Sequence, residues 1–274
     1  MTVKGLNADG SIAREGRLDR VTADFVPVVD AARAEIAAGF EAGRLHSAYL
    51  YGSIPRGTAT PGRSDLDLFL ALHGAPTDAD RARAQALEAR LDQRFRQING
   101  VGVGLSGARA VLSDLERHDL GFFVACLCTP LAGPDLAGHL PSYRPTSLLA
   151  RETNGDLGLA LPDWRRRLTS GAGLEALSRR VGRRLVRSGF TLVMPRWGGW
   201  TSDLGEAAEL FGGYYPQRAG QMRIAADVAR RPTADSAILR MLIDDLGEWL
   251  AGEYVAVHGR KLPRTGKDAA SAAG

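Results

Sequence analysis

The sequence predicts an α/β domain built on a mixed sheet, followed by a domain made of helices alone. The first observation behind this prediction is that apolar strand-like segments alternate with helical ones up to about residue 145. The second is that strand patterns stop there, while helical periodicity continues. The third is length, because 274 residues with 45% hydrophobic side chains can form two cores of ordinary size. We therefore assign residues 1–145 and 146–260 to the two domains, and 261–274 to a disordered tail.

The first domain shows helix and strand signals in regular succession. Its first helix is predicted by apolar residues at helical spacing, such as Phe25, Val29 and Ile36. In chain order, the expected elements are a loose lead-in (1–17), a helix from about Asp19 or Thr22 to Phe40, strands at 46–53 and 64–72, a helix at 77–96, a strand at 101–105, a small helix at 109–117 and a strand at 122–130. This order predicts a mixed sheet with helices on one side.

The second domain shows helical signals only, divided by breaks at glycine and proline. The expected helices lie at 146–169, 173–194, 203–211, 216–230 and 234–258. We find no internal repeat with the period of a solenoid protein, so this half is expected to be a single helical unit.

Composition argues against several classes of protein. No apolar run approaches the roughly 20 residues of a membrane helix, and the start lacks the apolar stretch of a secretory signal. The formal net charge of +4 is too small to indicate a nucleic-acid binder by itself. Cys126 and Cys128 provide no disulfide framework and are expected to be small core residues on a strand, so we predict a cytoplasmic protein. The five histidines lack the spacing of zinc ligands.

Two carboxylates stand out on the second predicted strand. Asp65 and Asp67 are two residues apart, so their side chains face the same side of the sheet, while Leu66 and Leu68 face the other. Carboxylate oxygens are the ligands that hard cations such as magnesium prefer. The alternative is a surface hairpin with one polar strand, since an isolated Asp-x-Asp pattern is common.

The loop before these carboxylates is suited to phosphate. Gly52 allows a close approach of the backbone, and Ser53 offers a hydroxyl and an N–H group to a phosphate oxygen. Arg56 and Arg63 flank the same loop and could neutralise a polyphosphate. Together with the carboxylate pair, this pattern predicts phosphoryl or nucleotidyl transfer from a nucleoside triphosphate.

Gly52-Ser53 followed by Asp65-Leu66-Asp67 resembles the signature of the DNA polymerase β-type nucleotidyltransferase superfamily. The fuller pattern, GSxxRG and then SDxD, is similar to that of its small bacterial members. The resemblance implies that Asp65 and Asp67 are catalytic and bind two magnesium ions, and that a nucleoside monophosphate passes to an acceptor hydroxyl. The residues that it assigns to ATP or another nucleoside triphosphate are Gly52, Ser53, Arg56 and Ser64.

A second resemblance lies in the helical half. Residues 183–226 resemble the helical domain of streptomycin/spectinomycin adenylyltransferases, with a loop, a helix that starts with acidic residues, and a Tyr-Pro entry to the next helix. This resemblance implies AMP transfer from ATP to a small-molecule acceptor such as an aminoglycoside, with release of pyrophosphate.

The chain departs from the superfamily pattern at one position. Members usually carry a third carboxylate on the next strand, and here that position falls on Gly102, which can neither bind metal nor take a proton. Three interpretations follow: a base from the helical domain, transfer without such a base at a loss of about 10²–10⁴-fold, or nucleotide binding without turnover. The candidates for a base or an acceptor contact in the helical domain are Glu152, Asp156, Trp197, Trp200, Asp203 and Glu206.

Arginines on one predicted helix leave the acceptor class open. Arg180, Arg183, Arg184 and Arg187 form a stripe at helical spacing. The stripe is either a solvated face or a patch that contacts triphosphate or RNA. Transfer to a protein or tRNA acceptor, as in toxin–antitoxin systems, therefore stands as the alternative to a small-molecule acceptor.

Overall fold

The computed structural model describes residues 4–41 and 43–261, and these form two compact units. One unit consists of residues 13–143, and the other of residues 4–12 together with 144–261. Of the predicted disordered tail, the residues after 261 lie outside the described residues. None of the described helices combines the length and the hydropathy needed to cross a bilayer.

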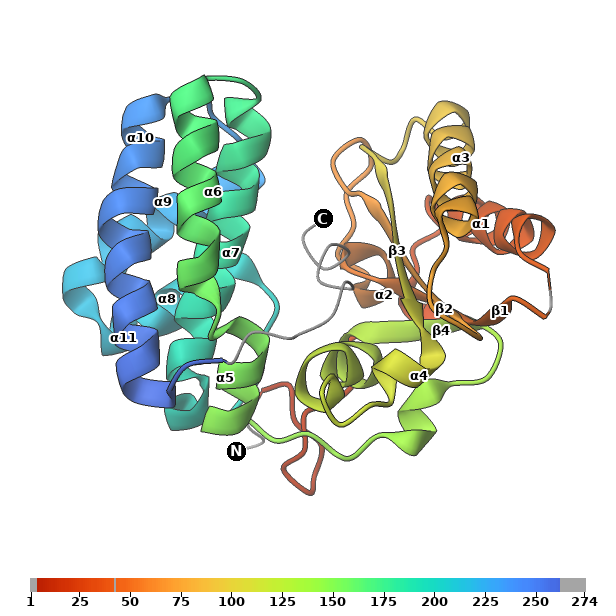
Figure 1. The fold of residues 1–274 in the computed structure, drawn as a ribbon, viewed down its shortest axis with the longest axis horizontal. Coiled ribbons are helices and arrows are strands. Elements are labelled where there is room, and N and C mark those ends of the chain that lie inside the picture. Colours follow the sequence, from red (N-terminus) through yellow and green to blue (C-terminus); the bar gives the residue numbers. More distant parts are fainter. Residues whose placement is uncertain (1–3, 42, 262–274) are drawn as a thin grey trace. The chain divides into compact units, whose positions relative to one another are not determined.

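The first unit is built on a four-stranded mixed sheet with the strand order β3-β2-β1-β4 (Figure 1). Its strands are β1 (Leu45–Tyr51), β2 (Leu66–Leu72), β3 (Val101–Gly107) and β4 (Cys128–Ala132). β1 pairs antiparallel with both β2 and β4, whereas β2 and β3 are parallel and are connected by α3 (Asp78–Arg94). The prediction of a mixed sheet followed by a mostly helical region is therefore confirmed.

One face of the sheet forms the larger core. Leu66, Leu68 and Leu70 are fully buried on this face, against α1 (Val26–Gly39) and α3. These leucines alternate with Asp65, Asp67 and Phe69, as a strand with its two faces in different environments requires. The apolar face thus fixes which side of β2 the carboxylates take.

The other face is also covered, so the prediction of helices on one side is wrong. Tyr49, Phe69 and Ala71 pack there with Val111 of α4 (Ala108–Val111) and with Val124. Tyr51, the register partner of Asp67, packs against this smaller core. The short helices that build it follow β3 and carry too few residues for a clear periodic signal.

The predicted strand at 122–130 is also wrong over most of its length. Residues Phe123–Leu127 form a π-helical turn, and β4 begins at Cys128. The last pair in the ladder joins Tyr51 of β1 to Cys128, and β1 ends there, so the residues before Cys128 have no strand to pair with. A short apolar run cannot be assigned to strand or buried helix from its periodicity alone.

The two cysteines at this junction are buried and form no disulfide. Burial raises the pKa of the Cys126 thiol to about 12 and raises that of Cys128 as well. Both thiols are therefore protonated at neutral pH and pack as small core residues.

The lead-in to this unit is held in place, contrary to the expectation that it is loose. The Glu15 N–H donates to the Cys126 carbonyl at 2.9 Å, and the Arg17 N–H donates to the Pro55 carbonyl at 2.9 Å. Arg14 forms an ion pair with Asp135 at 2.8 Å. Residues 14–17 thus pack against the segment that follows β1 and against the residues on either side of β4.

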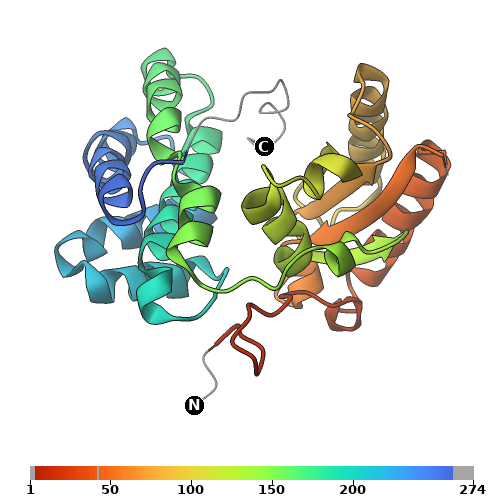
Figure 2. The ribbon, with the colours of Figure 1, turned by 60° about the horizontal axis from the view of Figure 1, so that its bottom comes forward.

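The second unit is a group of helices that run alongside one another (Figure 1 and Figure 2). They are α5 (Ser147–Asn154), α6 (Leu157–Ser170), α7 (Leu174–Trp197), α8 (Leu204–Tyr214), α9 (Ala219–Arg230), α10 (Ser236–Arg240) and α11 (Glu248–His258). α7 is the central helix and packs closely on α9, since a Cβ at Gly182 would lie 2.4 Å from the Ala225 carbonyl oxygen. Residues 4–12 attach to this unit, where the Trp200 N–H donates to the Lys4 carbonyl at 3.1 Å.

Candidate active site

The candidate active site lies at one end of the central strands of the sheet. Asp67 is the second residue of β2 and lies between two neighbours, Tyr51 of β1 and Gly102 of β3. Asp65 is the residue before β2. Because it lies two residues before Asp67, both carboxylates lie on the same face. Both side chains are partly exposed, whereas Leu66 between them is fully buried. The strand therefore presents two carboxylates together to solvent.

The turn after β1 brings backbone against one of these carboxylates. Gly52 has φ +83° and ψ −150°, a conformation open to glycine and strained for other residues. A Cβ at this position would lie 2.4 Å from the Asp67 Oδ2, closer than any side chain tolerates. The glycine thus leaves the edge of the Asp67 carboxylate accessible and lets the chain turn directly beside it.

Ser53 begins a single helical turn, α2 (Ser53–Arg56), that ends at Gly57. In one turn of helix, the N–H groups have no helical carbonyl four residues earlier to accept them. The Ser53 hydroxyl and these N–H groups are the kind of donors that hold phosphate oxygens. They follow immediately after the turn that contacts Asp67.

The loop between α2 and β2 is fixed by its own hydrogen bonds. The Ser64 hydroxyl accepts the Thr60 N–H at 2.9 Å, and the Ser64 carbonyl accepts the Asn99 N–H at 3.0 Å. Ser64 therefore fixes the conformation of the loop that leads to Asp65. Arg56 lies 3.4 Å from Glu15 Oε2, and Arg63 is exposed. The charge of Arg56 is thus partly balanced by Glu15 within the unit.

Two of these neighbours were not found from the sequence. Asn99 donates from its Nδ2 to the Asp65 Oδ1 at 3.3 Å, and Glu15 pairs with Arg56. The contact of Asn99 follows from topology, because β2 and β3 are parallel and begin side by side, with Leu66 opposite Val101. A prediction that β2 and β3 pair in parallel would therefore also have placed Asn99 next to Asp65.

Gly102, the residue at the position where the resemblance places a third carboxylate, lies beside Asp67 in the sheet. Gly102 is the register partner of Asp67 in the parallel pair, and a Cβ at residue 102 would lie 3.8 Å from the Asp67 Oδ1. Apart from the two chain neighbours, no other heavy atom of the described residues would come within 4 Å of that Cβ. Within residues 4–41 and 43–261, no group of three or more His, Cys, Asp or Glu side chains could hold a metal ion.

A pair of carboxylates nevertheless fits magnesium. Magnesium keeps several water ligands and is commonly held by one or two carboxylates together with substrate phosphates. Asp65 and Asp67 supply hard oxygen donors, and the bare backbone of Gly52 leaves room beside them. These two side chains are the residues that would hold the metal.

The helical unit contains the other predicted site residues, and Asp156 is the most constrained of them. It forms ion pairs with Arg184 and with Lys261, the latter at 3.5 Å. Burial alone would raise the pKa of the Asp156 carboxyl, but the two cations outweigh burial and hold the pKa below its usual value. A carboxylate held ionised in this way is a weak proton acceptor. Arg184 of the predicted stripe is therefore engaged in an ion pair.

The other acidic candidates of this unit also have structural partners. Glu152 pairs with Arg151 at 2.8 Å. Asp203 is the N-cap of α8 and accepts the Glu206 N–H at 2.8 Å. Glu206 accepts from Lys4 at 2.7 Å and so ties the start of the chain to this unit. These contacts give each residue a structural role without testing a second, catalytic one.

The two candidate tryptophans meet on one phenylalanine. Trp197 and Trp200 each contact Phe190 in an edge-to-face arrangement, with ring centroids 5.9 and 5.5 Å away. Trp200 is buried, whereas Trp197 is partly exposed. Trp200 thus fastens the turn after α7 to the core. Trp197 is the one of the pair with a ring surface still open to solvent.

The carboxylate strand and the turn before it lie in a stretch that is similar to a family of nucleotidyltransferase domains. Residues 40–99 match the family model described as "Nucleotidyltransferase domain", a stretch that includes the Gly52 turn, Asp65 and Asp67. The chain is therefore similar to nucleotidyltransferase domains over residues 40–99.

The similarity to a solved structure extends beyond this domain. The chain is similar to spectinomycin adenyltransferase AAD(9) from Enterococcus faecialis, whose crystal structure contains ATP and spectinomycin. The match has a TM-score of 0.52 and 14% sequence identity, and it covers 82% of this chain and 98% of the other. The curated proteins contain no significant match to the chain. At this identity, the structural match shows a common fold.

Proposed function

We propose that this protein transfers AMP from ATP to a hydroxyl group of a small molecule, such as an aminoglycoside. In this reaction the acceptor oxygen bonds to the α-phosphorus, the bond from that phosphorus to the β-phosphate oxygen breaks, and pyrophosphate leaves with the acceptor proton passing to water. The observation that carries the proposal is the carboxylate pair of Asp65 and Asp67 beside the Gly52 turn, within the matched nucleotidyltransferase domain. The small-molecule acceptor is supported by the overall similarity to an enzyme solved with ATP and spectinomycin.

The parts of the site have separate tasks under this proposal. Gly52, Ser53 and the N–H groups of α2 hold the triphosphate, with charge from Arg56. Asp65 and Asp67 hold magnesium, which when bound neutralises the charge that develops on the phosphate oxygens. Asn99 keeps Asp65 in position through its hydrogen bond, and Ser64 holds the loop that precedes Asp65. The tasks left to this chain are positioning and electrostatics, which dominate phosphoryl and nucleotidyl transfer.

The presence of a glycine at residue 102, beside Asp67, favours a second candidate function. Without a carboxylate at residue 102, a general base is missing from the sheet, and its loss costs about 10²–10⁴-fold in rate. A chain that binds ATP and turns over too slowly to matter would be a nucleotide-binding module. Asp156, Asp203 and Glu206 each already have a structural partner in the helical unit, and these contacts support the second candidate.

One assay separates these functions. The purified chain is incubated with ATP, magnesium and a panel of aminoglycosides and aminocyclitols, and pyrophosphate release is measured together with the mass of each acceptor. The proposal expects one acceptor to gain an adenylyl group with matching pyrophosphate release. ATP binding without release across the panel would favour the binding module, and labelling of RNA or protein in place of small molecules would favour a macromolecular acceptor.

A further inference from the structure

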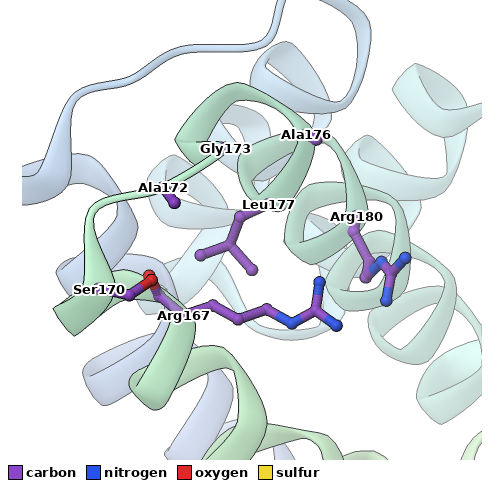
Figure 3. A pocket seen from close by; sticks show the side chains of 7 residues that line it. All are labelled: Arg167, Ser170, Ala172, Gly173, Ala176, Leu177 and Arg180. Atoms are coloured by element: carbon purple, nitrogen blue, oxygen red, sulfur yellow. The ribbon is translucent and has the colours of Figure 1, made fainter.

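The helical unit contains a cavity that the transfer reaction does not use. It lies where α6 ends and α7 begins, has a volume of about 330 Å³, and is shown in Figure 3. Ligand pockets begin at about 300 Å³, so the space suits a small molecule. Its lining combines two arginines, Arg167 and Arg180, with the apolar side chains of Ala172, Ala176 and Leu177.

The charge of this cavity is positive and is not balanced from within. Among the described residues that line it, none is acidic. Figure 3 shows the Arg167 side chain extended beneath Leu177, with its guanidinium group on the same side of the cavity as that of Arg180. Two cations beside one cavity repel each other, and an anion between them removes that cost.

The two arginines differ in how far they are already neutralised. Arg167 forms an ion pair with Asp163 in which its Nε lies 2.8 Å from the carboxylate, and the terminal nitrogens of its guanidinium remain for another acceptor. Arg180 is exposed and forms no ion pair with a carboxylate of the described residues. A guanidinium presents paired donors that match the oxygens of a phosphate. The cavity therefore has the donors for one phosphate group.

The rest of the lining indicates what is attached to that phosphate. The Ser170 hydroxyl donates to the Arg167 carbonyl at 2.8 Å and is not left to donate to a ligand. Leu177 is buried and forms an apolar wall together with Ala172 and Ala176. α7 also begins here, and its N-cap Gly173 supplies no side-chain oxygen, so the positive end of this helix adds to the field in the cavity.

We infer that this cavity binds a small organic phosphate, with the phosphate on Arg167 and Arg180 and the organic part against Leu177. This inference is independent of the transfer reaction, because no residue assigned to ATP or magnesium lines the cavity.

The test uses phenyl phosphate, which lacks the base and sugar of a nucleotide. Its binding to the full chain is measured by isothermal titration calorimetry at low salt with EDTA present, beside inorganic phosphate and phenol. Arg167→Gln and Arg180→Gln are each expected to weaken phenyl phosphate binding by about 10- to 100-fold. Inorganic phosphate is expected to bind more weakly than phenyl phosphate, and phenol not measurably. Circular dichroism confirms that the variants are folded.

Arg166→Gln is the matched control, since Arg166 is exposed, pairs with the same Asp163 and does not line the cavity. It is expected to leave the affinity unchanged. A dissociation constant for phenyl phosphate weaker than about 1 mM in the wild-type chain would overturn the inference. Equal weakening by all three substitutions would also overturn it, because net charge and not the cavity would then explain binding. Equal affinity for phenyl phosphate and inorganic phosphate would overturn the claim that the organic part of the ligand binds against Leu177.

Discussion

Asp67 of β2 and Gly102 of β3 are direct neighbours in the parallel part of the sheet, and a Cβ on Gly102 would lie 3.8 Å from the Asp67 Oδ1. A side chain placed at residue 102 would therefore project from the same face as the carboxylates that we assign to magnesium. Among the described residues other than its chain neighbours, Asp67 is the one that such a Cβ would approach within 4 Å.

This relationship predicts that Gly102→Glu increases the rate of transfer. The added carboxylate stands where it can take a proton or assist the metal, and general-base assistance is worth about 10²–10⁴-fold. The rate of pyrophosphate release at saturating ATP and acceptor measures the gain. Gly102→Gln is the control, because it has the same size without a base. Equal rates in both variants and the wild type, with all three folded, would show that position 102 has no part in the chemistry.

The Gly52 turn predicts a loss when a single methyl group is added. In Gly52→Ala the new Cβ would meet the Asp67 Oδ2 at 2.4 Å in a backbone conformation that alanine rarely adopts. We expect the free energy of unfolding to fall by about 1–3 kcal/mol in urea titrations, and the transfer rate to fall with it. Gly171→Ala shares the positive φ but meets no heavy atom within 4 Å, so it carries the backbone strain without displacing Asp67. If both substitutions left the transfer rate unchanged, the close approach of residue 52 to Asp67 would not be needed for the reaction.

Asp80 predicts a pH dependence of stability for the sheet unit. This buried carboxylate is the N3 residue of α3, and hydrogen bonds from Arg44 are the largest reason that its pKa is held well below the usual value. A depressed pKa means that the stabilisation is fully present above the unfolded pKa of about 4 and is lost as pH falls further. Asp80→Asn is therefore expected to cost about 3 kcal/mol at pH 7, because Arg44 loses its partner.

The control for Asp80 lies two residues away on the same helix. Asp78 is fully exposed and lies 3.7 Å from Arg81, so Asp78→Asn is expected to have little effect. Urea unfolding at pH 7 and at pH 3 gives both comparisons. The difference between Asp80→Asn and the wild type should shrink at pH 3. Equal losses in the two variants at pH 7 would contradict the role of the buried pair.

Asp156 predicts a separation between stability and catalysis. Because Arg184 and Lys261 hold the Asp156 carboxyl ionised, we expect Asp156→Asn to lower the unfolding temperature and to leave the maximal transfer rate within a few-fold of the wild type. Thermal denaturation and pyrophosphate release on the same preparation test this. A loss of about 100-fold in rate at an unchanged unfolding temperature would instead identify Asp156 as a general base.

The central part of the fold and the carboxylate pair could be predicted because both depend on local patterns. Alternation along 64–72 determines that Asp65 and Asp67 share a face, and burial of Leu66 and Leu68 on the other face confirms it. The register of Gly102 could also be anticipated, because the helix at 78–94 connects β2 to a parallel neighbour. These features follow from local patterns and from the single connection through α3.

The parts that could not be predicted depend on contacts between distant segments. The π-helical turn at 123–127 arises because β1 ends at Tyr51 and leaves no partner strand, which the apolar run itself does not reveal. In the same way, the hydrogen bond from Asn99 to Asp65 and the pairing of Glu15 with Arg56 link residues far apart in sequence. The anchoring of the lead-in belongs to this class, since its partners lie more than 30 residues away.

The most direct test of the account is label transfer from ATP labelled at the α-phosphate to an aminoglycoside or aminocyclitol acceptor, with the wild-type chain and with Asp65→Asn and Asp67→Asn. The substitutions remove one negative charge each and keep the shape of the side chains. We expect transfer by the wild-type chain in magnesium, and a loss of at least about 100-fold in each variant, because each substitution removes a carboxylate that would hold the metal. Transfer that persists at wild-type rates in both variants would contradict the claim that Asp65 and Asp67 form the reaction centre.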